Sequence, residues 1–494
     1  MTLNPNHCLD LKNGAFNATG PAELTGLFQT LAADPQRERL VVHFHGGLVS
    51  AANAATSIDT TLLSLYRQAG AYPVFFVWHS GALEVIQHNL AEIFREKIYQ
   101  RLLARVLQFV EAKLRQQPGE RGGRLELQDE FEFIDPLRQA GPTEVPLARL
   151  DTRRLAADAE LTDIEADQFR ETLEQDVIIP PEAAAIAAGL RSPAEIERDR
   201  ASRSPTVPGS RHSLMSPEAL RDLQPVDPAE RGLVSTSAII TGAGRVLGRV
   251  IKRLAQGRGH GVYTTCVEEL LREFYLANAG RQVWTWMKED TADAFGDDPG
   301  RYGGTAFLEQ LKAAWQPGQQ ITLVGHSTGA IYICHLLAHA AQRLPPEIKF
   351  DVVFLAPACD FRLWADTLAL HGDRIRHFRQ FGMSDALEAQ DRLVPQVPVY
   401  PRSLLYLVSG LLEDEPDQPI VGMERYYTDQ PPYDRYREIE LVRRFAAGAA
   451  RPRLVWAETD AGPGRRSQGT SHGAFDDEDP ATLASLQYLI REGF

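Results

Sequence analysis

The sequence predicts an α/β protein with a mostly parallel, doubly wound sheet. Short apolar runs rich in Val, Ile and Phe recur along the chain, and amphipathic helical stretches separate them. Strands that alternate with helices in this way are joined by crossovers, which makes neighbouring strands parallel. The chain of 494 residues is also long enough for one large domain that carries an insertion.

Most of the expected strands are short, mainly apolar runs, as is typical of strands buried on both faces of a parallel sheet, and residues 377–383 are a more polar run with aromatic residues. These runs are residues 40–44, 73–78, 320–324, 350–356, 377–383 and 453–457. Apolar residues at helical spacing predict helices between and after the strands. The expected helices are residues 51–68, 83–116, 237–256, 264–279, 305–315 and 480–491. Because 83–116 contains neither Pro nor Gly, it is expected to form one long helix.

A long insertion is expected between the strand that ends at Trp78 and the strand that begins at Gln320. We assign residues 1–94 to the N-terminal part of the core, 95–300 to the insertion and 301–494 to the C-terminal part. Residues 117–232 are rich in Pro, Arg, Asp and Glu and poor in aromatics, which predicts short helices and mobile loops that are partly disordered.

Bulk properties exclude several classes of partner. A net charge of −14 argues against binding to nucleic acid. Four scattered cysteines without a C-x-x-C spacing indicate reduced thiols. The N-terminus lacks the basic and apolar regions of a signal peptide, and no apolar run approaches a membrane span. We therefore expect a cytoplasmic protein without stable membrane insertion; peripheral lipid contact and the oligomeric state stay open.

The pentapeptide Gly325-His326-Ser327-Thr328-Gly329 is the most informative motif. It joins an expected strand to an expected helix, and G-x-S-x-G in that context predicts a nucleophile elbow. The flanking glycines permit a tight turn, the serine hydroxyl is exposed above the sheet, and the following helix directs its N–H groups toward a developing oxyanion. The alternative is a serine that only caps the helix.

A nucleophilic serine needs a base, and the base needs an orienting acid. His472 lies in the loop after the last expected strand, and Asp385 follows the strand that ends at residue 383. Together with Ser327 they lie at carboxyl ends of strands, where parallel sheets build their sites. Asp360 and Asp391 are alternative acids, because the pattern alone does not fix which loop supplies the carboxylate.

With these motifs the chain resembles the α/β-hydrolase superfamily, in particular its serine esterase and lipase branch. The resemblance covers roughly residues 40–94 and 300–494 and includes the order of nucleophile, acid and base. It implies an α/β-hydrolase fold in which His472 takes the proton of Ser327 and later protonates the leaving group, while Asp385 holds the imidazole tautomer. The resemblance is specific for fold and catalytic class but not for substrate.

His45-Gly46-Gly47, after the first expected buried strand, looks like the second oxyanion element of the same superfamily. The resemblance implies two backbone donors, the amide of Thr328 and the amide of Gly47. Gly46 or Leu48 are alternatives to Gly47.

No metal or organic cofactor is expected. His43 and His45 lie two residues apart on a strand, a spacing that suits a metal, but no further carboxylate or His clusters near them in sequence. Residues 237–248 are similar to the nucleotide loop of short-chain dehydrogenases, but Val246 replaces the middle glycine and the Y-x-x-x-K pair of that family is absent.

Two segments are candidates for covering the site. Residues 237–256 form a basic amphipathic pattern, which suits either a lid helix or an ordinary packed helix. Residues 403–412 are apolar almost all round and should be buried, either as a wall of an acyl pocket or as simple core.

The function expected from the sequence is hydrolysis of carboxylic esters through an acyl-serine intermediate, with a small or lipid-like ester that carries a hydrophobic acyl chain as substrate. The alternatives are an acyltransferase or peptidase with the same triad, a non-catalytic scaffold on a hydrolase fold, and a metal-dependent hydrolase that uses His43 and His45.

Overall fold

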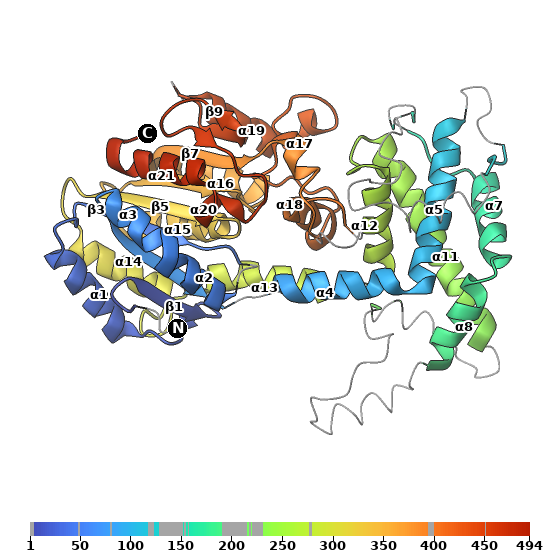
Figure 1. Ribbon diagram of the computed structural model, residues 1–494, viewed down its shortest axis with the longest axis horizontal. Coiled ribbons are helices and arrows are strands. Elements are labelled where there is room, and N and C mark those ends of the chain that lie inside the picture. Colours follow the sequence, from blue (N-terminus) through green and yellow to red (C-terminus); the bar gives the residue numbers. More distant parts are fainter. Residues whose placement is uncertain are drawn as a thin grey trace.

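The computed structural model describes residues 4–47, 50–79, 82–116, 123–127, 152, 155–156, 158–189, 215–216, 219, 231–275, 279–393, 400–449 and 451–494. Within this part of the chain an α/β body, built on an eight-stranded sheet, lies beside a lobe that is made of helices (Figure 1). The two termini both lie in the α/β body (Figure 1).

The sheet is mostly parallel, in the strand order β2-β1-β4-β3-β5-β6-β7-β8. Only the β1–β2 pair is antiparallel among its paired strands. The strands are β1 (Cys8–Lys12), β2 (Ala15–Phe16), β3 (Arg39–Phe44), β4 (Tyr72–Trp78), β5 (Gln320–His326), β6 (Phe350–Leu355), β7 (Ile375–Met383) and β8 (Leu454–Ala457). The predicted α/β class with a mostly parallel sheet is therefore confirmed.

Helices cover both faces of the sheet, and alternate residues of each strand point to opposite layers. On β3, Val42 and Phe44 pack into one buried cluster and Val41 into the other. The first layer contains α1 (Pro21–Ala33), α14 (Gly303–Ala314), α15 (Gly329–Arg343), α16 (Phe361–His371) and α19 (Arg437–Ala447). The second contains α2 (Ala51–Ser57), η1 (Ile58–Leu62), α3 (Leu63–Gln68), α20 (Ala474–Asp477) and α21 (Pro480–Glu492).

The helical lobe is reached through α4 and left through α13, which both run between the lobe and the sheet (Figure 1). Its helices are α4 (Ala82–Arg95), α5 (Lys97–Arg115), α7 (Asp163–Glu174), α8 (Ile179–Gly189), α11 (Arg231–Ala255), α12 (Val262–Phe274) and α13 (Ala279–Asp293). Helices α7 and α8 fall inside residues 117–232; most of that segment lies outside the described residues, so its predicted disorder stays a prediction.

The prediction of one continuous helix over 83–116 is wrong. The helix is interrupted at Glu96, whose backbone is extended (ψ 128°), and α5 then runs in a new direction (Figure 1). The side-chain amide of Gln100 donates to the carbonyl of Phe94, 2.8 Å away, and the hydroxyl of Tyr275 donates to the Glu96 carboxylate at 2.7 Å. These contacts satisfy polar groups at the break, and tertiary packing thus overrides local helix propensity.

The basic side of α11 faces α12 within the lobe. Arg249 and Arg253 pair with glutamates of α12 at 2.7–2.9 Å, and the Arg253 side chain is only 6 % exposed. Helix α11 packs on α5, α7, α8 and α12, in the lobe (Figure 1). Its arginines are thus partners of α12, as in the packed-helix alternative, and the lid role of residues 237–256 stays a prediction without a contact that supports it.

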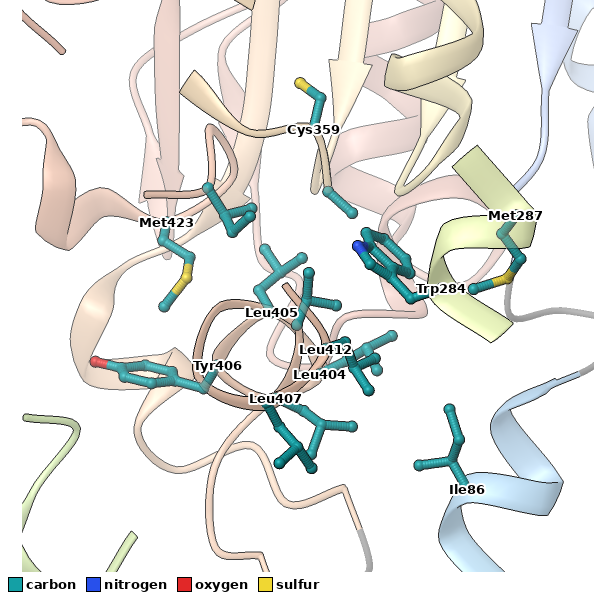
Figure 2. Close-up of a cluster of buried hydrophobic side chains, with 14 of the residues drawn as sticks. Ile86, Trp284, Met287, Cys359, Leu404, Leu405, Tyr406, Leu407, Leu412 and Met423 are labelled. Carbon is teal, nitrogen blue, oxygen red and sulfur yellow. The ribbon is translucent and has the colours of Figure 1, made fainter. Parts of the chain in front are cut away.

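The apolar segment 403–412 forms α18 (Leu404–Leu407) and a π-helical turn, η6 (Val408–Leu412), which are buried throughout. Figure 2 shows Leu404, Leu405, Leu407 and Leu412 among side chains that come from α4, α13 and the loop after β6. The predicted burial is confirmed. The segment packs between the sheet and the lobe. Its role as an acyl-pocket wall stays a prediction.

The remaining short elements are η5 (Gly372–Arg374), α17 (Asp385–Glu388), η7 (Glu424–Tyr426), η8 (Tyr433–Arg435), β9 (Thr459–Asp460) and β10 (Arg466–Ser467). None of the helices in the described part of the chain combines the length and apolarity that crossing a bilayer requires.

Candidate functional site

Ser327 occupies a sharp turn between β5 and α15, in the strand–turn–helix context that the sequence predicts. Its φ is +55°, in the left-handed region that L-residues with a side chain rarely adopt. The loop after β6 holds the turn from both sides: the Ser327 amide donates to the carbonyl of Leu355, and the amide of Ala358 donates to the Ser327 carbonyl, each at 2.9 Å. The strain is thus locked in by a neighbouring strand end.

The two glycines of the pentapeptide are required by close packing. A Cβ on Gly329 would lie 2.2 Å from the carbonyl oxygen of Phe44 in β3, and a Cβ on Gly325 would lie 2.7 Å from the backbone of Gly329. The elbow is therefore pressed against the end of β3, so that the loop after β3 lies beside the serine.

Contrary to the prediction from the sequence, the Ser327 hydroxyl is not exposed above the sheet, because the loops after β3 and β6 pack against the elbow: the residue is 2 % exposed, and its hydroxyl has no hydrogen-bond partner among the described residues. Thr328, not Ser327, is the N-cap residue of α15, and it makes no side-chain cap bond. The alternative in which Ser327 only caps the helix is therefore wrong. A buried unpaired hydroxyl costs free energy, about 1–3 kcal/mol, and such groups call for a functional explanation.

His472 is buried in the loop that precedes α20, and within the described part of the chain neither ring nitrogen has a hydrogen-bond partner. Its carbonyl accepts from Nε2 of His326 at 3.1 Å, and the two rings lie 5.2 Å apart between centroids. Because His326 is the residue before Ser327, this contact brings the His472 loop to the elbow. Burial, followed by the positive charge of His326, lowers the pKa of His472 to about 3, so its imidazole is neutral.

The three candidate acids have different surroundings. Asp391 accepts a hydrogen bond from the backbone amide of His472, at 3.1 Å, and burial raises the pKa of its carboxyl. Asp385, at the start of α17, accepts from the hydroxyl of Tyr406 at 2.7 Å. Asp360 caps α16 by accepting from the amide of Leu363 at 2.7 Å. Of the three candidate acids, Asp391 is the one whose hydrogen bond, among those of the described residues, reaches His472.

The His45-Gly46-Gly47 loop lies against the elbow. A Cβ on Gly46 would lie 3.2 Å from Cβ of Ser327. The amide of Gly47 donates a short hydrogen bond to Oγ1 of Thr328. Both predicted oxyanion donors thus belong to segments that touch the elbow, but the Gly47 N–H is taken up by the threonine hydroxyl. Leu48 lies outside the described residues.

His43 and His45 are both buried and make separate contacts. Nδ1 of His43 lies 2.7 Å from the hydroxyl of Tyr66, and Nε2 of His45 accepts from the amide of Trp78 at 3.0 Å. Burial lowers the pKa of His43 to about 3 and that of His45 to about 4. In the part of the chain that the structure describes, no group of three or more His, Cys, Asp or Glu side chains is arranged to hold a metal ion.

The pair formed by His326 and Asp476 was not predicted from the sequence. Nδ1 of His326 lies 3.2 Å from Oδ2 of Asp476, and both residues are buried. Burial acts to lower the pKa of His326, but the Asp476 carboxylate, together with the hydrogen bond to the His472 carbonyl and the charge of Asp477, raises it above its ordinary value. His326 was visible as the variable residue of the pentapeptide, whereas Asp476 stands in an acidic run, Asp476-Asp477-Glu478-Asp479, that reads as solvated surface.

Comparisons of the chain with protein-family models, with curated proteins and with solved structures give no significant match. The assignment of a function therefore rests on the chemistry of this site.

Proposed function

We propose that the protein is a serine hydrolase of the α/β-hydrolase type that cleaves carboxylic esters. The observation that carries this proposal is the Ser327 hydroxyl, which is buried, has no hydrogen-bond partner in the part of the chain that the structure describes, and is held in a left-handed turn between strand and helix. A neutral, unpaired imidazole, that of His472, stands in the neighbouring loop. A nucleophile and a base without other partners are what acyl transfer to serine requires.

In the proposed reaction, the His472 imidazole takes the Ser327 proton while Oγ attacks the ester carbonyl. The tetrahedral intermediate collapses as its C–O bond to the alcohol breaks and His472 returns the proton to the leaving alkoxide. Water, deprotonated by the same imidazole, then cleaves the acyl-serine ester and the proton goes back to Oγ. The Ser327–His472 hydrogen bond would form on substrate binding, since catalytic hydrogen bonds are often unmade in free enzymes.

For the orienting acid, the contacts favour Asp391 over the expected Asp385. The Asp391 carboxylate already binds the His472 amide, whereas that of Asp385 is engaged by Tyr406. From the backbone amide of His472 this carboxylate would have to turn to the imidazole on substrate binding, where it would fix the tautomer and stabilise the imidazolium formed during the reaction. Asp391→Asn is therefore expected to lower kcat more than Asp385→Asn does.

The oxyanion would be stabilised by the Thr328 amide at the start of α15, and by the Gly47 amide once Thr328 Oγ1 releases it. Removing one such donor typically costs about 2.7–4 kcal/mol of transition-state stabilisation. A Thr328→Val variant keeps the backbone amide and frees that of Gly47, so it separates the two roles of this residue.

A hydrophobic or lipid-like acyl ester remains the proposed substrate class, because a site whose nucleophile and base are both enclosed favours apolar groups. No nucleic-acid partner is proposed, given the net charge of −14. The cytoplasmic location also stays a prediction.

The test is turnover of aryl esters with short and long acyl chains by the wild type, Ser327→Ala and His472→Ala. Ser64→Ala, at an exposed serine of α3, is the matched control. The proposal expects turnover in the wild type and the control and its loss in the other two. Absence of turnover from folded wild type would favour a scaffold, activity that survives Ser327→Ala but not a chelator would favour a metal-dependent hydrolase, and product that appears only with an added acceptor would favour an acyltransferase.

A further inference from the structure

The ring of His326 touches the base loop on one side and a buried carboxylate on the other. Nε2 lies 3.1 Å from the carbonyl oxygen of His472, and Nδ1 lies 3.2 Å from Oδ2 of Asp476. His326 itself is 2 % exposed. The ring thus connects the elbow, the loop that carries the base and the first turn of α20.

The chemistry of the two contacts determines the protonation state of the His326 ring. A carbonyl oxygen only accepts, so Nε2 must carry a proton. A carboxylate facing Nδ1 favours a proton there as well, and burial strengthens that attraction. His326 and Asp476 therefore form a buried imidazolium–carboxylate pair directly behind the nucleophile.

We propose that His326, held by Asp476, is a positioning residue for the base: it anchors the His472 loop at the elbow and places a positive charge beside the His472 imidazole. The inference rests on the proposed function and extends it, since it assigns a role to the residue at the first variable position of the pentapeptide. Burial lowers the pKa of His472 first, and the charge of His326 lowers it further, so that the imidazole stays available as a base at lower pH than burial alone would allow.

Other charged groups near the pair act in defined directions. The buried rings of His43 and His45 also lie near Asp476 and are neutral. Asp477 follows Asp476, accepts a short hydrogen bond from the Ser57 hydroxyl and interacts more weakly with His326.

On the side of the base, Asp391 binds the amide of His472. The two strongest influences of other ionisable groups on the imidazole of His472 are therefore the positive charge of His326 and, opposed to it, the carboxylate of Asp476.

The test uses His326→Gln, in which the amide can still donate to the His472 carbonyl but carries no charge. A unit charge about 5 Å away, at an effective dielectric constant of about 20, changes the pKa of a neighbouring group by about two pH units. The rate of labelling by a fluorophosphonate probe falls at low pH as His472 becomes protonated, and we call this part of the pH profile the acid limb. We expect the acid limb to move to higher pH by about one to two pH units in His326→Gln, so that labelling on it slows about tenfold or more.

Two further variants separate charge from fold. In Asp476→Asn the carboxylate is lost and His326 gives up its proton, so the two opposing charges disappear together and the acid limb is expected to move less than in His326→Gln. Asp477→Asn is the matched control, with the neighbouring carboxylate removed. Titration of ¹³C-labelled histidine rings by NMR, with His472 assigned from His472→Ala, measures the same shift without any activity.

The inference is overturned if His326→Gln, folded by circular dichroism, leaves the His472 titration and the acid limb where Asp477→Asn leaves them. If the wild type does not label at all, the proposed function fails, and the NMR titration still decides whether His326 sets the charge state of His472.

Discussion

Replacing Ser327 by glycine and by alanine measures how much strain the elbow stores. Its φ of +55° is left-handed, and that conformation costs an L-residue with a side chain about 1–2 kcal/mol. Glycine adopts it freely but loses about 0.5–1 kcal/mol through its greater freedom in the unfolded chain. Ser327→Gly is therefore expected to be more stable than Ser327→Ala by about 0.5–1 kcal/mol.

Both variants also remove the unpaired hydroxyl, so both are expected to exceed the wild type in stability, by about 1 kcal/mol or more. Proteins commonly give up stability at functional sites in this way. The same pair of substitutions at Ser64, in the right-handed helix α3, provides the control. There glycine should be less stable than alanine by about 1 kcal/mol.

Urea-induced unfolding followed by circular dichroism gives the free energies, provided that the variants share one m value. The comparison of glycine with alanine must then have opposite signs at positions 327 and 64. If glycine destabilises relative to alanine at both positions, Ser327 is not strained and the account of the elbow is refuted.

Three further predictions concern packing and charge. Gly329→Ala places a methyl group against the backbone of β3 and is expected to destabilise by about 1–3 kcal/mol, whereas Gly248→Ala, with open space around it on α11, should stabilise by up to about 1 kcal/mol in the same urea assay. The pKa of His43 is about 3 when folded and about 6.5 when unfolded, so between these values the unfolded chain binds the extra proton and stability falls as the pH falls, by up to about 1.4 kcal/mol per pH unit. His43→Gln should make the fall in stability less steep, and an unchanged slope would contradict the assignment. Arg253→Met removes a buried cation from Glu268 and Glu269, although His260 and Arg249 remain beside them, and is expected to cost about 3–5 kcal/mol. Arg245→Met, at a side chain that is 51 % exposed, is expected to cost at most about 1 kcal/mol, and equal losses would refute the role of burial.

Five of the six strands β3 to β8 could be predicted because each is mainly apolar, which leaves a local signal in the sequence; β7 carries Arg376, His377 and Arg379 and leaves a weaker signal. β1 was missed because Cys8–Lys12 alternates apolar and polar residues over only five positions and is followed by a two-residue partner. The break at Glu96 was missed because its causes are tertiary: the partner of its carboxylate, Tyr275, is distant in sequence.

The candidate site likewise combines features that a local motif predicts and features that depend on tertiary contacts. The elbow is a local motif, so its position, turn and flanking glycines could be predicted from five residues. The choice between Asp385 and Asp391 depends on how the chain after β7 folds back on the His472 loop, which spacing does not determine. The pairing of His326 with Asp476 joins residues 150 positions apart that have no common motif, and only the fold brings them together.

Peptide mass spectrometry that locates the residue modified by a fluorophosphonate probe tests directly whether Ser327 is the nucleophile. We expect one rapidly formed adduct on Ser327, absent from His472→Ala and unaffected by Ser64→Ala. Folded wild-type protein that stays unmodified, or that carries its adduct on another serine, would contradict the claim that Ser327 is an activated nucleophile.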